Sequence, residues 1–255
     1  MKGTNWQRDE LILAFNLYCK TPFGRIHNRN PDIIALANII GRSPSAVSWK
    51  LANFARLDPS LKQRGIAGAT HGSKSEVEIW HAFNDSWEQL AFESECLLAR
   101  AKGQSVEQAV DNKGEELPKE GRERERFVRL RINQKFFRST VLATYDSRCC
   151  VTGLPVVELL VASHIVPWSH DAKNRLNPRN GLCLNAIHDR AFDRGLLTIT
   201  PEYHVKLSSS LQGFVEDTSV IDLLAQYDGQ KMRLPQRFVP DQDFITYHND
   251  VIFQS

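Results

Sequence analysis

Residues 148–197 read RCCVTGLPVVELLVASHIVPWSHDAKNRLNPRNGLCLNAIHDRAFDRGLL. The apolar run at 154–164 is rich in Val and Leu and predicts a strand. A loop rich in Asn, Asp, Pro and Gly follows, and LCLNA at 182–186 predicts a second short strand. The segment at 187–195, IHDRAFDRG, predicts one or two helical turns that stop at its final glycine. The stretch therefore predicts a finger of strand, loop, strand and helix.

Three polar residues stand at defined places in this finger. His164 ends the first strand, Asn180 precedes the second, and His188 lies in the helix, at separations of 16 and 8 residues. This order resembles the HNH nuclease family, whose ββα-metal finger cuts phosphodiester bonds, and the strings ASHIVPW and HDRAFDRG resemble its strand end and helix. The resemblance extends over the preceding segment 131–153 and on to Phe253, about half of the chain.

The resemblance implies a chemistry that these residue types can perform. A neutral imidazole takes a proton from water near pH 7, which makes His164 the candidate general base. A divalent cation, Mg²⁺ or Mn²⁺, holds the phosphate and the leaving oxygen, and His188 is its candidate ligand. Asn180 is placed with the catalytic residues because its amide can bond backbone groups and so aim the ring of His164.

One position departs from the family pattern. The residue before the base is often Asp, Glu or His and serves as a second metal ligand, whereas this chain has Ser163, and a hydroxyl is a weak ligand for a hard cation. Ser163 and His188 are the predicted ligands, with Asp189 and Asp193 as further candidates. Asp193 is equally suited to bond backbone groups near the end of the helix.

Composition limits the kinds of protein that this sequence encodes. A chain of 255 residues has room for one large or two small domains. We expect no membrane span, since no apolar run reaches about 18 residues. Charges interrupt the first fifteen residues, so we expect no export signal and a cytoplasmic protein. The net charge of +2 means that any nucleic-acid surface is local.

The five cysteines are scattered and odd in number, which argues against a disulfide framework and fits a reducing compartment. Some HNH proteins hold a structural zinc in two Cys-x-x-Cys pairs. This chain contains no such pair, and we predict no structural zinc. Cys183, in an apolar strand, is predicted to lie in the core.

The N-terminal part predicts a helical DNA-reading domain at 1–101. A helix is expected at 4–20, another at 31–40, and a third that Ser43 caps and Pro44 begins. Two helices joined by a tight turn with Gly41 resemble a helix-turn-helix, and a plain helical hairpin is the alternative. The residues predicted to contact DNA from the third helix are Ser45, Ser48, Lys50 and Asn53.

The remaining segments complete an α+β plan with a winged-helix-like N-terminal domain. The Gly-rich segment 61–74 is either a wing or a surface loop, and 75–101 predicts one long helix. Few apolar residues occur at 102–121, which predicts a linker. The nuclease domain is then 122–255. Its first helix carries a run of basic residues without an acid, from which Arg129 and Lys135 are predicted to contact phosphates.

These features predict a metal-dependent endonuclease that cuts double-stranded DNA, most simply a restriction enzyme of type II or of the modification-dependent type IV kind. Since one HNH finger cuts one strand, a double-strand cut predicts a homodimer. Two alternatives stay open. One is a DNA-binding regulator with an inactive HNH-like fold, for which Ser163 leaves room. The other is a nicking or homing-type nuclease.

Overall fold

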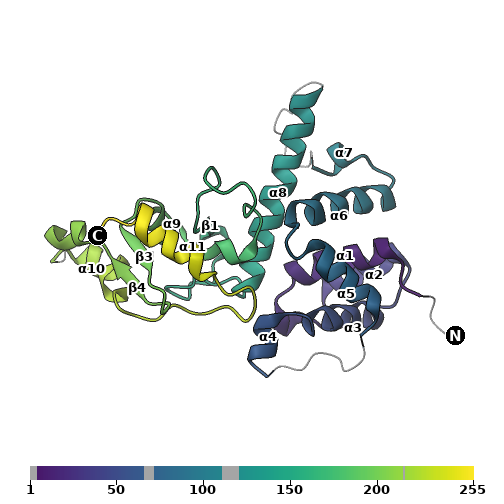
Figure 1. Ribbon diagram of the computed structural model, residues 1–255, viewed down its shortest axis with the longest axis horizontal. Coiled ribbons are helices and arrows are strands. Elements are labelled where there is room, and N and C mark those ends of the chain that lie inside the picture. Colours follow the sequence, from purple (N-terminus) through teal and green to yellow (C-terminus); the bar gives the residue numbers. More distant parts are fainter. Residues whose placement is uncertain (1–4, 66–71, 111–120, 215) are drawn as a thin grey trace. The chain divides into compact units, whose positions relative to one another are not determined.

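The computed structural model describes residues 5–65, 72–110, 121–214 and 216–255 (Figure 1). The chain divides into two compact units, Met1–Phe136 and Phe137–Ser255. The described parts are α+β, with a mostly helical first unit and small sheets in the second. The division falls inside a helix, C-terminal to the predicted linker at 102–121. Half of that linker, residues 111–120, lies outside the described residues, and α7 (Val106–Val110) lies within the other half.

The first unit is built from helices. They are α1 (Arg8–Lys20), η1 (Phe23–Arg25), α2 (Pro31–Ile40), α3 (Pro44–Ala55), α4 (Pro59–Gln63), α5 (Lys74–Phe83), α6 (Trp87–Ala101), α7 (Val106–Val110) and the first part of α8 (Arg122–Thr144). No strand occurs among its described residues, so the expected wing is not seen there. Residues 66–71 of the segment proposed as a wing lie outside the described ranges.

The turn between α2 and α3 forms as local sequence predicts. The side chain of Asn30 accepts the amide hydrogen of Asp32, and Pro31 begins α2. Gly41 ends it in the left-handed region, at φ 67°, where a residue without a Cβ is favoured. Ser43 then accepts from the amide of Ala46 and caps α3. The predicted helix pair and its starting residues are therefore confirmed.

Two other predicted helices differ from the structure. The helix expected at 4–20 begins only at Arg8, because Gln7 and Glu10 form a reciprocal capping box. The single long helix expected at 75–101 is two helices, α5 and α6, broken at residues 84–86. The sequence there is Asn-Asp-Ser, whose short polar side chains compete with helical hydrogen bonds.

Aromatic rings form the core of the first unit. Phe15 is fully buried, and its ring lies 4.9 Å from Phe54, 5.4 Å from Trp80 and 6.4 Å from Trp87 between centroids. Tyr18 joins this cluster and donates a buried hydrogen bond of 3.1 Å to Asp58. Rings at such separations pack edge-on or offset and supply much of the buried apolar area. The apolar stripe of α5 and α6 is therefore core.

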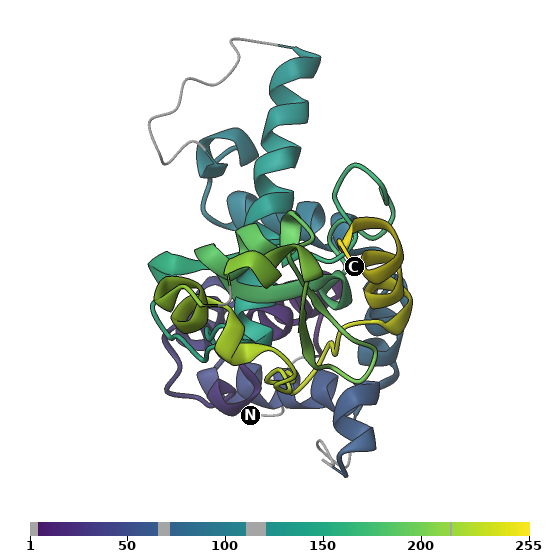
Figure 2. The same ribbon diagram turned by 90° about the vertical axis from the view of Figure 1, so that its left-hand side faces the viewer.

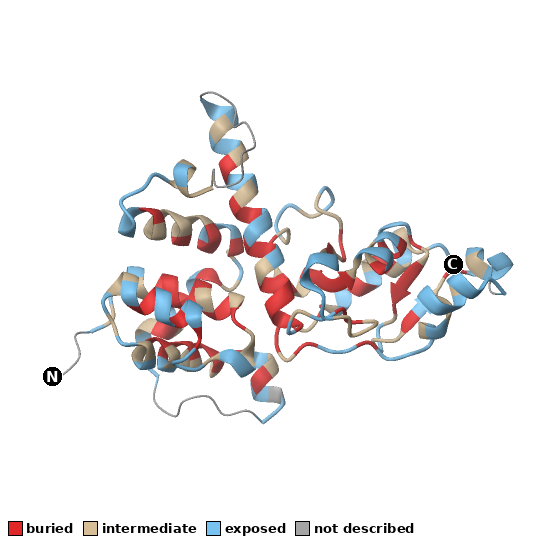
Figure 3. Cartoon of the chain, turned by 180° about the vertical axis from the view of Figure 1, so that it is seen from behind, coloured by how far each residue is buried: buried red, intermediate tan, exposed pale blue. Residues whose placement is uncertain are grey.

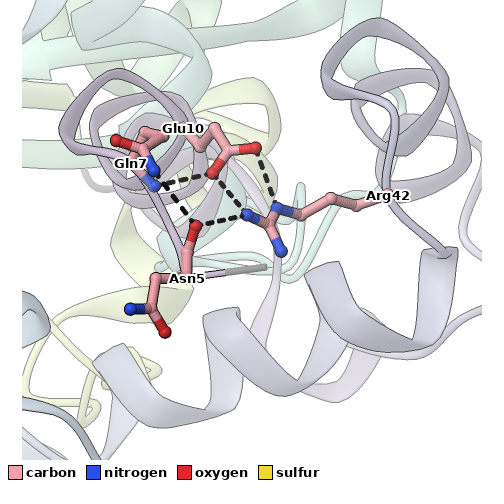
Figure 4. Close-up of polar contacts among 4 residues, drawn as sticks. All are labelled: Asn5, Gln7, Glu10 and Arg42. Carbon is pink, nitrogen blue, oxygen red and sulfur yellow. Dashed lines mark hydrogen bonds and ion pairs between the residues drawn. The ribbon is translucent and has the colours of Figure 1, made fainter. Parts of the chain in front are cut away.

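Arg42 fixes the α2–α3 turn to the start of α1 (Figure 4). Its guanidinium donates to both carboxylate oxygens of Glu10, at 2.8 and 2.7 Å, and to the carbonyl of Asn5 at 2.9 Å. The cation also lies 4.4 Å from the ring centre of Trp6. Burial raises the pKa of Glu10, but the bonds from Arg42 and from the Gln7 amide outweigh it, so the pKa is lowered.

The second unit combines two small sheets with short helices. Its elements after α8 are η2 (Val157–Leu159), β1 (Leu160–His164), η3 (Pro178–Asn180), β2 (Gly181–Asn185), α9 (Ala186–Asp193), β3 (Leu197–Ile199), β4 (Val205–Leu207), η4 (Ser209–Phe214), α10 (Thr218–Leu223), η5 (Ala225–Tyr227), α11 (Gln242–Tyr247) and a π-helical turn at His248–Ile252. The β1–β2 and β3–β4 pairs are both antiparallel. The predicted strand–loop–strand–helix order is confirmed.

The core of this unit lies between α8, the β1–β2 pair and α9, where buried positions are red in Figure 3. Cys183 is buried there as predicted, together with Cys149 and Cys150, and all the cysteines are free thiols. Burial raises the pKa of Cys183 to about 12, so its thiol stays protonated and unreactive. Within the described ranges, no helix combines the length and the apolar character needed to cross a bilayer.

Candidate active site

The β1–β2 pair brings His164 to the end of a short ladder, opposite Gly181. Glycine is needed there because a Cβ would lie 2.5 Å from Cγ2 of Val141 and 3.1 Å from Cζ of Phe137 on α8. The missing side chain lets α8 approach the ladder. As a result the ring of Phe137 stacks on that of His164, with centroids 3.8 Å apart and planes 6° from parallel.

The His164 ring is held in one tautomer. Its Nε2 lies 2.8 Å from the carbonyl oxygen of Arg175, and a carbonyl can only accept, so Nε2 carries the hydrogen. Nδ1 is left as the basic nitrogen. Burial lowers the pKa of His164, and the bond to Arg175 opposes this only in part. The ring is therefore neutral near pH 7 and able to take a proton, and its role as the general base stays a prediction.

Asn180 closes the loop between the two strands. The side chain is fully buried; its Oδ1 accepts from the amide of Val166 at 2.8 Å, and its Nδ2 donates to the carbonyls of Val166 and Asn174 at 3.1 and 3.3 Å. Its own carbonyl accepts from Ile165 at 3.0 Å. Asn180 thus binds the backbone directly after His164 and holds this part of the loop in place.

A cavity of about 300 Å³ opens beside this ring, and Ser163, His164, Asp189 and Asp193 line it. Burial raises the pKa of Asp189, with the Ser163 hydroxyl and Arg190 opposing the rise. The pKa of Asp193 is raised by burial and by the charge of Asp189. The cavity thus brings two half-buried carboxyl groups, each with a raised pKa, beside a neutral imidazole.

Residues 149–200 match the HNH endonuclease family. The matched span contains β1, β2 and α9, and β1 and α9 carry His164, Asp189 and Asp193 of the cavity lining. It assigns an HNH endonuclease domain to this part of the chain and indicates a nuclease. No curated protein matches the chain.

The HNH domain does not bring His188 to the cavity that His164 lines. His188 is 2% exposed, and its ring meets Tyr227 edge-on at 5.3 Å between centroids. Burial lowers its pKa to about 4, and neither ring nitrogen has a hydrogen-bond partner among the described residues. Asp189 and Asp193, four residues apart, share one face of α9, whereas His188 is rotated by about 100°. The prediction of His188 as ligand therefore disagrees with this lining.

The remaining donors of the HNH domain fit a hard divalent cation. Within the described ranges, no three His, Cys, Asp or Glu side chains form a complete metal-binding group. The cavity does offer two carboxylates and the Ser163 hydroxyl, which is buried and makes no hydrogen bond of good geometry among the described residues. A cation would favour the charged forms of Asp189 and Asp193 that burial now disfavours, and water would complete its coordination.

The first unit uses two of the predicted DNA contacts internally. Lys50 is buried in an ion pair with Glu76, which is itself 0% exposed. Asn53 donates to the same carboxylate at 2.8 Å. Removing this buried carboxylate from its partners would leave an uncompensated charge, so both side chains are structural. The prediction that Lys50 and Asn53 read bases does not agree with this arrangement.

The exposed face of α3 carries the other two residues and one that sequence reasoning missed. Ser45 is exposed and Ser48 half-buried, and Ser45 accepts a hydrogen bond of 3.3 Å from Asn28 in the preceding loop. Trp49 is 65% exposed on the same helix. Single exposed apolar side chains are common on protein surfaces, so a contact made by Trp49 is a proposal.

Three exposed basic residues of α8, Arg129, Lys135 and Arg138, have different surroundings. The guanidinium of Arg129 lies 3.8 Å from the ring centre of Phe92. Lys135 is exposed, and its charge adds to the effect of burial in lowering the pKa of Lys20. Arg138, in the second unit, donates to the carbonyls of Leu160 and Val157. That residue therefore supports β1, and phosphate contact by Arg129 and Lys135 stays a prediction.

Proposed function

We propose that this protein is a metal-dependent endonuclease that hydrolyses phosphodiester bonds in double-stranded DNA. The observation that carries the proposal is the common cavity of His164, Asp189 and Asp193, with His164 fixed in the tautomer that leaves Nδ1 basic. In this proposal, Nδ1 of His164 is the proton acceptor and the two carboxyl groups are the cation ligands around one cavity. Their combination is what hydrolysis of a phosphodiester requires.

His164 activates the attacking water. The carbonyl of Arg175 holds Nε2–H, the ring of Phe137 fixes its plane, and Nδ1 takes the proton as the water oxygen attacks phosphorus. Burial keeps the ring neutral beforehand, because it lowers the pKa. The hydrogen bond to Arg175 then stabilises the imidazolium that forms.

Asp189 and Asp193 would hold the cation, with Ser163 as a weak additional donor. A bound Mg²⁺ or Mn²⁺ supplies charge compensation for the phosphate and the leaving 3′ oxygen. Asn180 keeps the loop after His164 closed, so that the base keeps its position relative to the cavity. His188 is left to pack against Tyr227.

The first unit selects the DNA site through α3. Ser45, Ser48 and Trp49 offer hydroxyl and aromatic groups of the kind that contact base edges in a major groove. Arg25 and Arg29 are exposed in the loop whose Asn28 bonds Ser45, and their charge suits flanking phosphates. Arg129 and Lys135 add phosphate contacts from α8.

A nuclease domain joined to a separate helical unit supports a restriction role in host defence. Selection of a modified base by the helical unit is part of this proposal and comes from analogy with two-domain HNH enzymes. A double-strand cut requires two HNH domains, so the active form is a homodimer. Nicking of one strand is the outcome if the protein acts as a monomer.

Replacing Trp49 with alanine should weaken binding to the preferred duplex roughly tenfold, the scale of one lost base contact. Fluorescence anisotropy with labelled duplexes, without metal so that no cutting occurs, measures the effect. Ile34→Ala, which removes another exposed apolar side chain, from α2, is the matched control and should bind normally. Asn53→Ala should lower the melting temperature through loss of the Glu76 bond. Unchanged binding by Trp49→Ala would exclude α3 as the reading helix.

The function itself is tested by cleavage of matched plasmids that are unmodified, adenine-methylated, cytosine-methylated, hydroxymethylated or phosphorothioated. We expect cutting of at least one plasmid with Mg²⁺ or Mn²⁺ and none with EDTA. Linear product indicates paired cuts, and nicked circles indicate one active site. Cleavage that persists unchanged in EDTA would contradict metal dependence.

One rival function is a DNA-binding regulator without nuclease activity. Ser163 favours it, because a carboxylate or imidazole at that place would give the cation a stronger ligand. Specific binding with no cleavage of any plasmid in the panel, at any Mg²⁺ or Mn²⁺ concentration, would support this rival against the nuclease.

A further inference from the structure

A segment outside the family match reaches the cavity. Residues 241–254, here called the clamp segment, comprise α11 and the π-helical turn that follows it, yellow in Figures 1 and 2. The match ends at residue 200, yet His248 and Ile252 of the clamp segment line the same cavity as His164, Asp189 and Asp193. The cavity therefore needs a part of the chain that the HNH finger does not contain.

The clamp segment binds the end of α9, the helix that carries both carboxylates. His248 Nε2 lies 3.1 Å from the carbonyl of Phe192, and the side chain of Gln254 donates to the carbonyl of Arg194 at 2.8 Å. The amide of Gln254 donates to the carbonyl of Gly195 at 2.9 Å. Carbonyls at a helix end lack partners within the helix, and a helix of eight residues is too short to be stable alone.

Gly195 allows this contact. Its φ of +68° suits glycine, and a Cβ there would lie 2.1 Å from the carbonyl oxygen of Ile252. The backbone of the clamp segment thus occupies the space that any side chain at this position would fill. The end of α9 and the clamp segment fit together only because this residue is glycine.

His248 is fully engaged in holding α9. Nε2 donates to Phe192, so Nδ1 carries no hydrogen and accepts from the Thr198 hydroxyl at 2.8 Å. The ring also stacks on Phe192, with centroids 3.7 Å apart. With both nitrogens occupied, His248 lines the cavity without being available as a base or a ligand.

Tyr247, the residue before His248, contacts the loop that follows His164. The hydroxyl of Tyr247 lies 2.6 Å from Nδ1 of His170, in the loop that follows His164 and supplies the Arg175 carbonyl. Consecutive residues of one helix therefore contact the loop that holds the base and the helix that holds the carboxylates. Such outer contacts set the geometry of a site and not only its stability.

We propose that His248 of the clamp segment is a positioning residue, which holds Asp189 and Asp193 in place relative to His164. The inference rests on the proposed nuclease function. It assigns a specific task to a region that would otherwise be framework. Tyr247 assists by holding the His164 loop.

The test compares His248→Ala with His248→Gln and with Asn249→Ala. Glutamine can still donate to Phe192 and accept from Thr198, so it should restore most of what alanine loses. Asn249 lies on the same turn but donates to the carbonyls of Ile199 and Ile245, away from α9, which makes Asn249→Ala the matched control. Each variant is made in the full chain.

Two measurements do not depend on cleavage. Mn²⁺ binding by calorimetry should weaken about tenfold in His248→Ala, the scale seen when an outer contact to a ligand is lost. Hydrogen exchange of peptides that cover α9 should accelerate in the same variant without metal. Both should stay near the wild-type values in Asn249→Ala. Cleavage by His248→Ala should need correspondingly more Mn²⁺ than cleavage by the wild type, and His248→Gln should need less Mn²⁺ than His248→Ala.

Equal Mn²⁺ affinity and equal exchange in His248→Ala and Asn249→Ala would overturn the inference and leave the segment as framework. If His248→Ala does not fold, Gln254→Ala, which removes only the side-chain bond to Arg194, carries the same comparison. A wild-type protein that neither binds Mn²⁺ nor cuts DNA would defeat the proposed function. In that case, faster hydrogen exchange of α9 in His248→Ala but not in Asn249→Ala would still show that His248 holds α9. Unchanged exchange in His248→Ala would exclude this role.

Discussion

Replacing His164 with alanine is expected to lower the rate of DNA cleavage by about 10²–10⁴-fold, the usual contribution of a general base. The variant should bind DNA and Mn²⁺ normally, because the base touches neither the proposed reading helix nor the cation in our assignment. Single-turnover cleavage at saturating metal measures the chemical step. His81→Ala, an exposed histidine of α5, is the matched control.

The cause of this loss can be separated from misfolding. His164 is packed between Phe137 and Trp168, so its removal leaves space in the cavity wall. Imidazole added to His164→Ala can enter that space and should restore part of the rate if the missing group is a base. A variant that cuts at the wild-type rate would remove His164 from the mechanism.

The second large effect concerns the cation. Asp189→Asn keeps the shape of the side chain and removes its charge, so it should lower cleavage by roughly 10²-fold, equivalent to about 3 kcal/mol of transition-state stabilisation. His188→Phe, which keeps a ring against Tyr227, should leave the dependence on Mn²⁺ unchanged. Calorimetric Mn²⁺ titrations of both proteins, alongside cleavage, make the comparison.

The opposite result would restore the assignment made from sequence. If His188→Phe lost Mn²⁺ binding while Asp189→Asn kept it, His188 would be the ligand despite lying outside the cavity lining. Asp193→Asn completes the set. If the two carboxylates share the cation, Asp193→Asn should lower cleavage by about as much as Asp189→Asn.

Sequence reasoning succeeded where the deciding contacts are local. Asn30 and Ser43 cap the helices that follow them, and Gly41 ends α2 in the left-handed region, so the helix pair is predictable from neighbouring residues. The order of His164, Asn180 and the helix after them is equally local. The hydrogen bonds of Asn180 span only 6 and 14 residues.

Sequence reasoning could not foresee contacts whose partner is distant along the chain. Lys50 is a residue type that often contacts DNA, but its side chain is buried in an ion pair with Glu76, which lies 26 residues away in the sequence. His188 fits the family spacing, yet the next residue, Asp189, lines the cavity, because neighbouring residues of a helix point in directions about 100° apart. The bond from His248 to Phe192 spans 56 residues, and no short pattern announces it.

The junction of Asn180 and Gly181 also affects how the protein ages. An asparagine followed by glycine is the pairing most prone to deamidation, because little hinders the next amide nitrogen from attacking the side chain. Here the amide group is buried and bonded on both sides, so the attack requires the loop to open first. An aspartate formed there would face the carbonyls of Val166 and Asn174 with an acceptor in place of a donor. Each brief opening therefore carries a risk of permanent damage, and the chemical lifetime of the enzyme is tied to how seldom this loop opens.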